Sequence, residues 1–384
     1  MRLLAAWRLG LPLLLLSTVA CSKRETVIGP GAGPDWDSGP PHLAAAFRHT
    51  ASLWRLEFSP DGRYVAAGSL QVGNAGLWDV RRGIPLATLG SPAAGLLTFA
   101  FSPDSRFIAT GTHGTGAQIW DLPLGHLLAS VGHPHTWAVR FSPDGRFLAT
   151  GGSDSRLNIW SVPQGDSVVS ALSPSSMSDL AYSPDGNYIV SAGFNGSATV
   201  WDAHSLAPLT TVDPQLGPIE RVAISPDGRY FVTAGYSETV EAAKLWQLPT
   251  GQLVTSLSEN VDIGSVPGQI WDVSVAFDRL GKYVATCRWN VGVVYEVPSG
   301  RVAAILRPGG RVYDIDFSPD GRYLATADQD GNLVIWDGFR SVAKLPGEYG
   351  PTGLRTVAFS PVDKLIATGG ADSTVRLWAP FIPY

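Results

Sequence analysis

The residues that could take part in chemistry gather around one stretch of the chain, residues 141–160. His133, Thr150 and Asp154 supply an imidazole, a hydroxyl and a carboxylate, the groups used in acid–base and nucleophilic catalysis. His133 and His135 could also suggest a metal site, but no third ligand lies nearby in the sequence, and two histidines alone make a weak site. The chain has no Gly-x-Ser-x-Gly, His-Glu-x-x-His or Walker motif. We therefore predict no catalytic, cofactor-binding or metal-binding residues.

The stretch itself, FSPDGRFLATGGSDSRLNIW, has the pattern of strands and turns. Ser142-Pro143-Asp144-Gly145 is a turn signal, because Pro sets φ at the second position and Gly supplies the positive φ that often follows. Short apolar runs flank this turn, and a second break at 151–155 leads into a third run that ends at Trp160. Three strand-length runs joined by tight turns predict an antiparallel meander.

The same unit recurs along the chain. The turn begins at Ser59, Ser102, Ser142, Ser183, Ser225, Ser318 and Ser360, with a degenerate copy at Asp278. The third run ends at Trp78, Trp120, Trp160, Trp201, Trp246, Tyr295, Trp336 and Trp378. These positions lie 40 to 49 residues apart, and seven of the 13 tryptophans fall in this register. Such a period indicates a repeat architecture rather than two or three separate domains.

This pattern resembles the WD40 repeat family over residues 42–384. The Trp that ends the third run is followed by Asp at Asp79, Asp121, Asp202 and Asp337. The resemblance implies an all-β fold, a β-propeller in which each blade is a four-stranded antiparallel sheet. Packing the blades face to face would bury both sides of each meander, in agreement with strands that are apolar on both faces.

The number of blades follows from the fourth strands. Apolar runs follow the third strand at 86–89, 127–131, 168–172, 209–212, 253–257, 302–306 and 342–345. After Trp378 no such run remains, and His42–Phe47 can supply the missing strand from the other end of the domain. Ring closure of this kind also removes an exposed sheet edge. We predict eight blades closed by an N-terminal strand, with seven as the alternative if the copy at Asp278 is irregular.

The resemblance also assigns a role to the residues first considered for chemistry. In this family a His, a Ser or Thr, an Asp and the Trp form a buried hydrogen-bonded set, and the third blade offers all four as His133, Thr150, Asp154 and Trp160. We interpret them as structural residues that hold the blade together.

Binding is predicted where the repeat is irregular and at the start of the first strands. Insertions on one face of a repeat protein often mark its binding face, and the segments at 236–243, 258–272 and 287–290 are such irregularities. The first strands begin with residue types common in interfaces. The candidate partner-binding residues from both sources are Trp54, Trp137, Glu220, Glu238, Trp271, Trp289, Tyr313 and Arg355. One position further on, Arg55, Asp179, Arg221 and Asp314 alternate in sign and suggest a channel lined by compensating charges.

The start of the chain is expected to lie outside the propeller. Arg2 and Arg8 precede an apolar run at 9–16, which predicts a signal peptide over residues 1–20. Thr18-Val19-Ala20-Cys21 resembles a bacterial lipoprotein box, which implies lipidation of Cys21, and the following Ser22 hints at the outer membrane. Residues 21–41 are rich in Gly and Pro and predict a flexible tether. The alternative is an ordinary signal peptide and a soluble periplasmic protein.

Composition limits the partners. The net charge is −5 and charged residues make up 16% of the chain, against about 25% in typical domains. Without a basic stripe, nucleic acid is excluded as the expected partner. We predict a monomeric propeller, tethered to the bacterial cell envelope by its lipid, that acts as a non-catalytic scaffold for a protein partner and needs no cofactor. The alternative is a periplasmic propeller enzyme, quinoprotein-like or lactonase-like.

Overall fold

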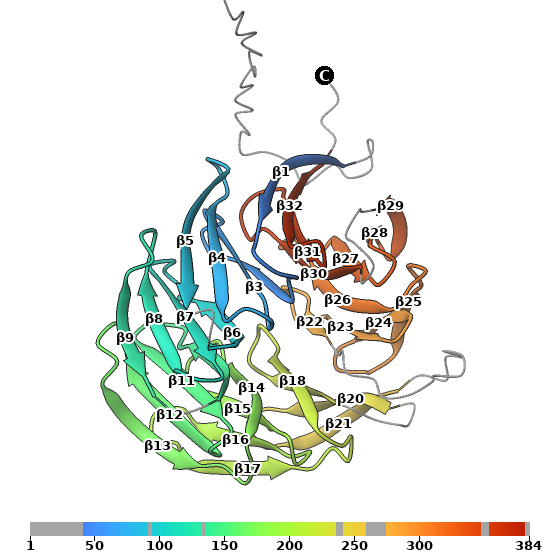
Figure 1. Ribbon diagram of the computed structural model, residues 1–384. Coiled ribbons are helices and arrows are strands. Elements are labelled where there is room, and N and C mark those ends of the chain that lie inside the picture. The colour runs from blue at the N-terminus through green and yellow to red at the C-terminus, as the bar shows by residue number, and fades with distance from the viewer. Residues whose placement is uncertain are drawn as a thin grey trace, which may run out of the picture. The chain divides into compact units, whose positions relative to one another are not determined.

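The computed structural model describes residues 41–90, 94–132, 135–235, 241–258, 274–346 and 353–380 (Figure 1). The chain divides into two units, Met1–Gly33 and Pro34–Tyr384, and the first lies outside the described residues. The described part of the second unit is all-β and forms eight four-stranded antiparallel sheets, each of which is a blade. No helix in these ranges is long and apolar enough to span a membrane.

The first four blades each consist of four consecutive strands. Blade 1 contains β2 (Arg55–Phe58), β3 (Tyr64–Gly68), β4 (Asn74–Asp79) and β5 (Ile84–Gly90). Blade 2 contains β6 (Leu96–Phe101), β7 (Phe107–Thr112), β8 (Ala117–Asp121) and β9 (Leu127–Val131). Blade 3 contains β10 (Thr136–Phe141), β11 (Phe147–Gly152), β12 (Arg156–Ser161) and β13 (Ser167–Leu172). Blade 4 contains β14 (Met177–Tyr182), β15 (Tyr188–Gly193), β16 (Ala198–Asp202) and β17 (Pro208–Val212).

The next three blades repeat this order, and the last one does not. Blade 5 contains β18 (Ile219–Ile224), β19 (Tyr230–Gly235), β20 (Glu241–Gln247) and β21 (Gln252–Ser258). Blade 6 contains β22 (Val275–Phe277), β23 (Tyr283–Arg288), β24 (Val291–Glu296) and β25 (Val302–Leu306). Blade 7 contains β26 (Val312–Phe317), β27 (Tyr323–Asp328), β28 (Asn332–Asp337) and β29 (Arg340–Pro346). Blade 8 contains β30 (Leu354–Phe359), β31 (Ile366–Gly370), β32 (Thr374–Ala379) and, as its outer strand, β1 (His42–Arg48).

The blades form a closed ring. The first strand of each blade contacts the first strand of the next, in the order β2, β6, β10, β14, β18, β22, β26, β30 and back to β2. Within the described ranges, one apolar cluster fills each of the eight spaces between neighbouring blades. The predicted eight-bladed propeller is therefore confirmed, and the alternative of seven blades is wrong.

Closure by the N-terminal strand is also confirmed. Strand β1 pairs antiparallel with β32, with Phe47 opposite Val375 and Leu43 opposite Trp378 (Figure 1). Phe47 is 5% exposed and stacks on Trp78 of blade 1 with 5.8 Å between ring centroids. The first strand of the domain thus completes the last blade and also packs against the first one.

The repeated turn works through its Ser and its Asp. In blade 3 the Ser142 hydroxyl donates to Asp144 Oδ1 at 2.6 Å and accepts the N–H of Phe147 at 3.0 Å, while Gly145 has a φ of 70°. In the degenerate copy of blade 6, Asp278 replaces Ser and accepts the Tyr283 N–H through Oδ1 at 2.7 Å. A carboxylate can make the same bond as a hydroxyl acceptor, so blade 6 keeps the regular turn.

The third-strand Trp is held by the second strand. The indole N–H of Trp160 donates to Thr150 Oγ1 at 2.8 Å. Equivalent bonds join Trp120 to Thr110, Trp201 to Ser191, Trp246 to Thr233, Trp336 to Thr326 and Trp378 to Thr368. Asp154 Oδ1 accepts the N–H of Arg156 at 3.1 Å, and His133 lies outside the described residues. A buried indole N–H needs an acceptor, and the repeat supplies one from the neighbouring strand.

Candidate functional site

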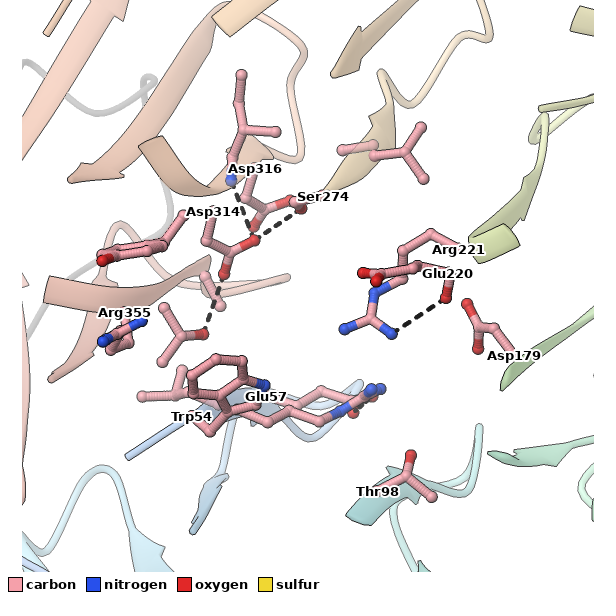
Figure 2. Close-up of a pocket in the computed structure, with 18 of the residues that line it drawn as sticks. Trp54, Glu57, Thr98, Asp179, Glu220, Arg221, Ser274, Asp314, Asp316 and Arg355 are labelled. Carbon is pink, nitrogen blue, oxygen red and sulfur yellow. Dashed lines mark hydrogen bonds and ion pairs between the residues drawn. The ribbon is translucent and has the colours of Figure 1, made fainter. Parts of the chain in front are cut away.

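The first strands of all eight blades surround a cavity of about 630 Å³ (Figure 2). Its lining comes from β2, β6, β14, β18, β22, β26 and β30, from Trp137 of β10, and from four residues beside these strands, Trp54, Leu70, Phe194 and Ser274. Half of the lining residues are charged or aromatic. The volume falls within the range of about 300–1,000 Å³ that is usual for ligand sites.

Five of the predicted partner-binding residues line this cavity: Trp54, Trp137, Glu220, Tyr313 and Arg355. They come from blades 1, 3, 5, 7 and 8, so only the ring brings them together. Of the other candidates, Glu238 and Trp271 lie outside the described residues. Trp289, in the turn between β23 and β24, does not line the cavity but approaches it through Arg311.

A β-bulge presents most of these side chains. In β26, Val312 pairs with Asp328 and Asp314 pairs with Ala327, which leaves Tyr313 as the extra residue. The same shift makes extra residues of Leu97, Trp137, Ser178, Glu220 and Arg355 in their own first strands. A bulge leaves one residue out of the ladder and redirects its side chain. The bulged residues occupy equivalent positions in these six blades, and we call the opening that they surround the mouth of the cavity.

One side of the mouth is a row of alternating cations and rings. The guanidinium carbon of Arg355 lies 4.1 Å from the Tyr313 ring centroid and 5.2 Å from that of Trp54. Arg311 lies 5.4 Å from the same Tyr313 ring and 5.1 Å from Trp289. Cation–π contacts stabilise by about 0.5–1 kcal/mol when exposed. The row joins blades 6, 7, 8 and 1 and holds large side chains in place at the surface.

A second aromatic group lies around Trp137. Its ring makes edge-on contacts with His113 of blade 2, at 5.3 Å between centroids, and with Phe194 of blade 4, at 5.6 Å. His113 Nδ1 is 2.8 Å from His135 Nδ1. Sequence reasoning did not single out His113, Phe194 or Arg311. Their position in or beside the turns that face the mouth was the available signal.

Inside the ring, carboxylates bind backbone N–H groups of the next blade. Asp314 Oδ2 accepts the N–H of Val357 at 3.0 Å, and Asp316 Oδ2 accepts that of Phe359 at 2.8 Å. Asp179 Oδ2 accepts the N–H of Val222 at 3.3 Å. The first strand is the inner edge of its sheet, and an edge strand has N–H groups without a ladder partner. The channel carboxylates satisfy some of them and join neighbouring blades.

Burial shifts the protonation of these acids. Burial, supported by the charge of Asp314, raises the pKa of Asp316 from its ordinary 3.8 to about 7, against the opposing Phe359 N–H. Burial also raises the pKa of Asp314 and of Glu57. Asp314 accepts four hydrogen bonds, since the Ser274 and Thr356 hydroxyls and the Ile315 N–H donate to it as well. Figure 2 shows Ser274, Asp314 and Asp316 together on one wall of the cavity.

Three arginines occupy the other part of the channel. Arg140 Nη2 donates to Asp179 Oδ1 at 2.7 Å, and Arg55 Nη2 lies 3.7 Å from Glu57 Oε2. Arg221 Nη1 donates to the backbone oxygen of Glu220, at 3.4 Å (Figure 2). Burial, together with the positive charges of Arg140 and Arg221, lowers the pKa of Arg55 to about 10. The predicted lining of Arg55, Asp179, Arg221 and Asp314 is present. Asp314 and Asp316 lie on one wall, whereas Asp179 and Glu57 lie beside arginines.

The arrangement is suited to binding. In the part of the chain that the structure describes, no three His, Cys, Asp or Glu side chains are placed to hold a metal ion. The cavity instead offers guanidinium donors below a rim of aromatic rings. These are groups that recognise a partner by hydrogen bonds, charge and ring contact.

Two protein-family models match parts of this chain. The family model described as "WD domain, G-beta repeat" matches residues 43–71, 83–121, 125–161, 303–337 and 339–379. A second family model, "Eukaryotic translation initiation factor eIF2A", matches residues 150–261, which extend from blade 3 to blade 5. Both matches fall on propeller blades.

Individual relatives share short segments with this chain. Jouberin of Rattus norvegicus is 34% identical over 89 residues, which are 22% of this chain and 8% of Jouberin. Guanine nucleotide-binding protein subunit beta-2 of Caenorhabditis elegans is 36% identical over 64 residues, 17% of each chain. The beta subunit of Nicotiana tabacum is 34% identical over 73 residues, 18% of each chain. This chain therefore matches less than about a fifth of the length of these curated relatives.

A solved structure shares the fold over nearly the whole ring. The crystal structure of the computationally designed Ika8 protein matches with a TM-score of 0.72, covering 88% of this chain and 99% of that chain. Sequence identity is 19%, so the similarity concerns the fold alone.

Proposed function

Since this chain is an eight-bladed β-propeller that carries WD40 repeats, we propose that it is a non-catalytic scaffold that binds a protein partner at one mouth of its channel. The observation that carries the proposal is the convergence of Trp54, Trp137, Tyr313 and Arg355 around one cavity. They belong to four different blades and lie far apart in the sequence, so only the ring brings them together. Propellers with WD40 repeats commonly bind protein partners. The fold alone does not say which face of the ring binds, so the site must identify it.

The mouth has the properties of an interaction surface. Trp54 is 41% exposed and Phe194 is 39% exposed, although both are large apolar side chains. Aromatic residues and Arg are enriched at interface positions that contribute most to affinity. The contacts of Arg355 with two rings pre-organise this surface, which lowers the entropy lost on binding. A partner could therefore bind here with little rearrangement.

The acids of the channel support a binding role over a quinoprotein-like or lactonase-like enzyme. Both oxygens of Asp314 accept two hydrogen bonds each, so little capacity remains for a metal ion or a substrate proton. Asp179 is joined to Arg140 and to the backbone of Leu180 and Val222. These carboxylates are used to join blades.

A crosslinking experiment tests the proposed face. A photo-crosslinking amino acid in place of Trp54 should form a specific adduct in cells, whereas the same group in place of Leu280 should not. Leu280 is 77% exposed, more than Trp54, but it lies in the turn at the other end of a first strand, so low accessibility cannot explain the absence of an adduct there. Adducts of the same identity and yield at both positions would refute the mouth as the binding face.

We further propose that the propeller is tethered to the bacterial cell envelope through lipidated Cys21. The basic residues Arg2 and Arg8, the apolar run that follows and the stretch Thr18-Val19-Ala20-Cys21 support this proposal. Incorporation of radiolabelled palmitate and sedimentation with membranes should both be lost in Cys21→Ser. Unchanged labelling of that variant would refute the tether while leaving the scaffold proposal intact.

A further inference from the structure

The basic part of the channel has guanidinium N–H groups that the protein itself does not use. Arg55, Arg140 and Arg221 come from the first strands of blades 1, 3 and 5. Arg55 and Arg221 line the cavity, and Figure 2 shows Arg221 reaching into the open space between the labelled acids. A guanidinium carries five N–H donors in a planar fork. If these N–H donors lack acceptors within the protein, they can bind a ligand.

The three arginines are paired to very different extents. Arg140 is bound at 2.7 Å to Asp179, a nearly buried carboxylate. Arg55 is 3.7 Å from Glu57, beyond hydrogen-bond distance. Among the described residues Arg221 makes no ion pair, and its one hydrogen bond, to a backbone oxygen at 3.4 Å, is long. Most of the donors of Arg55 and Arg221 therefore remain available to a ligand.

Arg55 has two other cations near it. Arg140 and Arg221 both act on Arg55 to lower its pKa, which places the three cations within electrostatic reach of one another. Glu57 and Asp179 act on Arg55 in the opposite direction, and burial raises the pKa of Glu57. Like charges held together out of bulk water repel strongly, and an opposite charge between them removes that cost. On the acidic wall, Asp314 already accepts four hydrogen bonds.

We propose that Arg55 and Arg221 form a carboxylate-binding site, with Arg140 as its supporting charge, for an acidic side chain of a polypeptide that enters through the mouth. The aromatic rim sets the partner's chemistry further. Trp54, Trp137 and Phe194 suit apolar residues that flank the acid, while Arg355 adds a cation at the opening. The proposal rests on the proposed function and specifies its partner as an extended acidic segment with apolar neighbours.

Peptide binding to the whole chain tests the site. The probes are acetylated, amidated tetrapeptides of glutamate, glutamine and lysine, each carrying one fluorescent label, with binding followed by anisotropy. The glutamate peptide should bind at least about tenfold more tightly than the glutamine peptide, and added salt should weaken it because charge pairs are screened. The lysine peptide should not bind.

Variants locate the binding. Arg221→Gln should weaken the glutamate peptide about tenfold or more, and Arg221→Lys should restore only part of the affinity because it keeps the charge without the planar fork. Arg229→Gln is the matched control, since Arg229 belongs to the same blade but stacks on Tyr230 beside the turn that ends β18. The melting temperature of each variant should stay near that of the parent, which excludes unfolding as the cause.

Several outcomes would overturn the carboxylate site. Equal affinity of Arg221→Gln and Arg229→Gln for the glutamate peptide is one, and no glutamate binding at about 1 mM peptide is another. Inorganic phosphate that binds more tightly than the peptide and displaces it would assign the site to a free oxyanion instead. A further outcome is that Arg221→Gln leaves both peptide binding and the crosslinks through position 54 unchanged. That result would refute the carboxylate site but would leave the mouth as the binding face.

Discussion

Tyr313 and Arg355 are the bulged residues of neighbouring blades, and they stack on each other across the blade boundary at 4.1 Å from guanidinium carbon to ring centroid. Each bulge frees one side chain from its ladder, and the ring places the two freed side chains face to face. The contact therefore arises because two neighbouring blades have the same bulge. It positions a half-buried cation between Tyr313 and Trp54 at the mouth.

Removing this cation should affect binding much more than stability. Arg355→Ala should lower the free energy of unfolding by only about 0.5–1 kcal/mol, the value of an exposed cation–π contact. Crosslinking from position 54 should fall strongly, because Arg355 no longer holds the side chains at positions 54 and 313 in place. Urea unfolding and adduct yield are the two measurements, with Arg229→Ala as control. A full adduct yield with Arg355→Ala would show that the partner does not use this part of the rim.

Asp314 should contribute strongly to stability, because it accepts four hydrogen bonds inside the ring. In Asp314→Ala four donors lose their acceptor: the Ser274 and Thr356 hydroxyls and the backbone N–H groups of Ile315 and Val357. Leaving a buried donor unpaired costs about 1–3 kcal/mol, so a loss of about 3 kcal/mol in urea unfolding is expected. Asp314→Asn should lose less, because its amide oxygen still accepts. Equal losses for the two variants would contradict this role of the carboxylate oxygens.

Asp316 should make stability depend on pH. Its pKa is about 7 in the folded protein and near 3.8 when unfolded, so between these values the folded chain holds a proton that the unfolded chain has released. This contribution is present below pH 4, declines as the pH rises to about 7, and is lost above that, with a slope of at most about 1.4 kcal/mol per pH unit.

The variant Asp316→Asn isolates this contribution, since the amide keeps an acceptor for the Phe359 N–H and does not titrate. Its stability relative to the parent should increase from pH 5 to pH 8, as measured by urea unfolding at each pH. A difference that is constant over this range would show that Asp316 is ionised throughout.

The closing strand offers a matched pair of substitutions. Phe47 and Leu43 both belong to β1, but Phe47 is 5% exposed whereas Leu43 is 49% exposed. Phe47→Ala should lower the free energy of unfolding by about 3–5 kcal/mol, the usual cost of truncating a buried aromatic residue. Leu43→Ala should cost less than about 1 kcal/mol. Similar unfolding curves for the two variants would mean that β1 does not close the ring in solution.

Much of the fold could be read from local patterns. The Ser-Pro-Asp-Gly turn, the apolar runs and the Trp that ends each third strand are properties of contiguous residues, and the turn geometry at Ser142 and Gly145 agrees with them. Counting strands against tryptophans also predicted β1, because Trp378 lacked a following run. Blade 6 could be counted because Asp278 is able to accept the same backbone bond as the Ser of other blades.

The sequence by itself determined the repeat, the eight blades, the closing strand and nine of the side chains that line the cavity. Only the tertiary structure decided how these side chains meet, because their contacts join residues about 40 positions apart and depend on ring closure and on bulges. A period of two along a strand does not reveal which residue is left out of the ladder, so the roles of Tyr313 and Arg355 as a stacked pair were not predictable. The same holds for the channel charges. Their alternation in sequence suggested mutual compensation, but among the described residues Arg221 makes no ion pair, and Asp314 accepts hydrogen bonds from four donors.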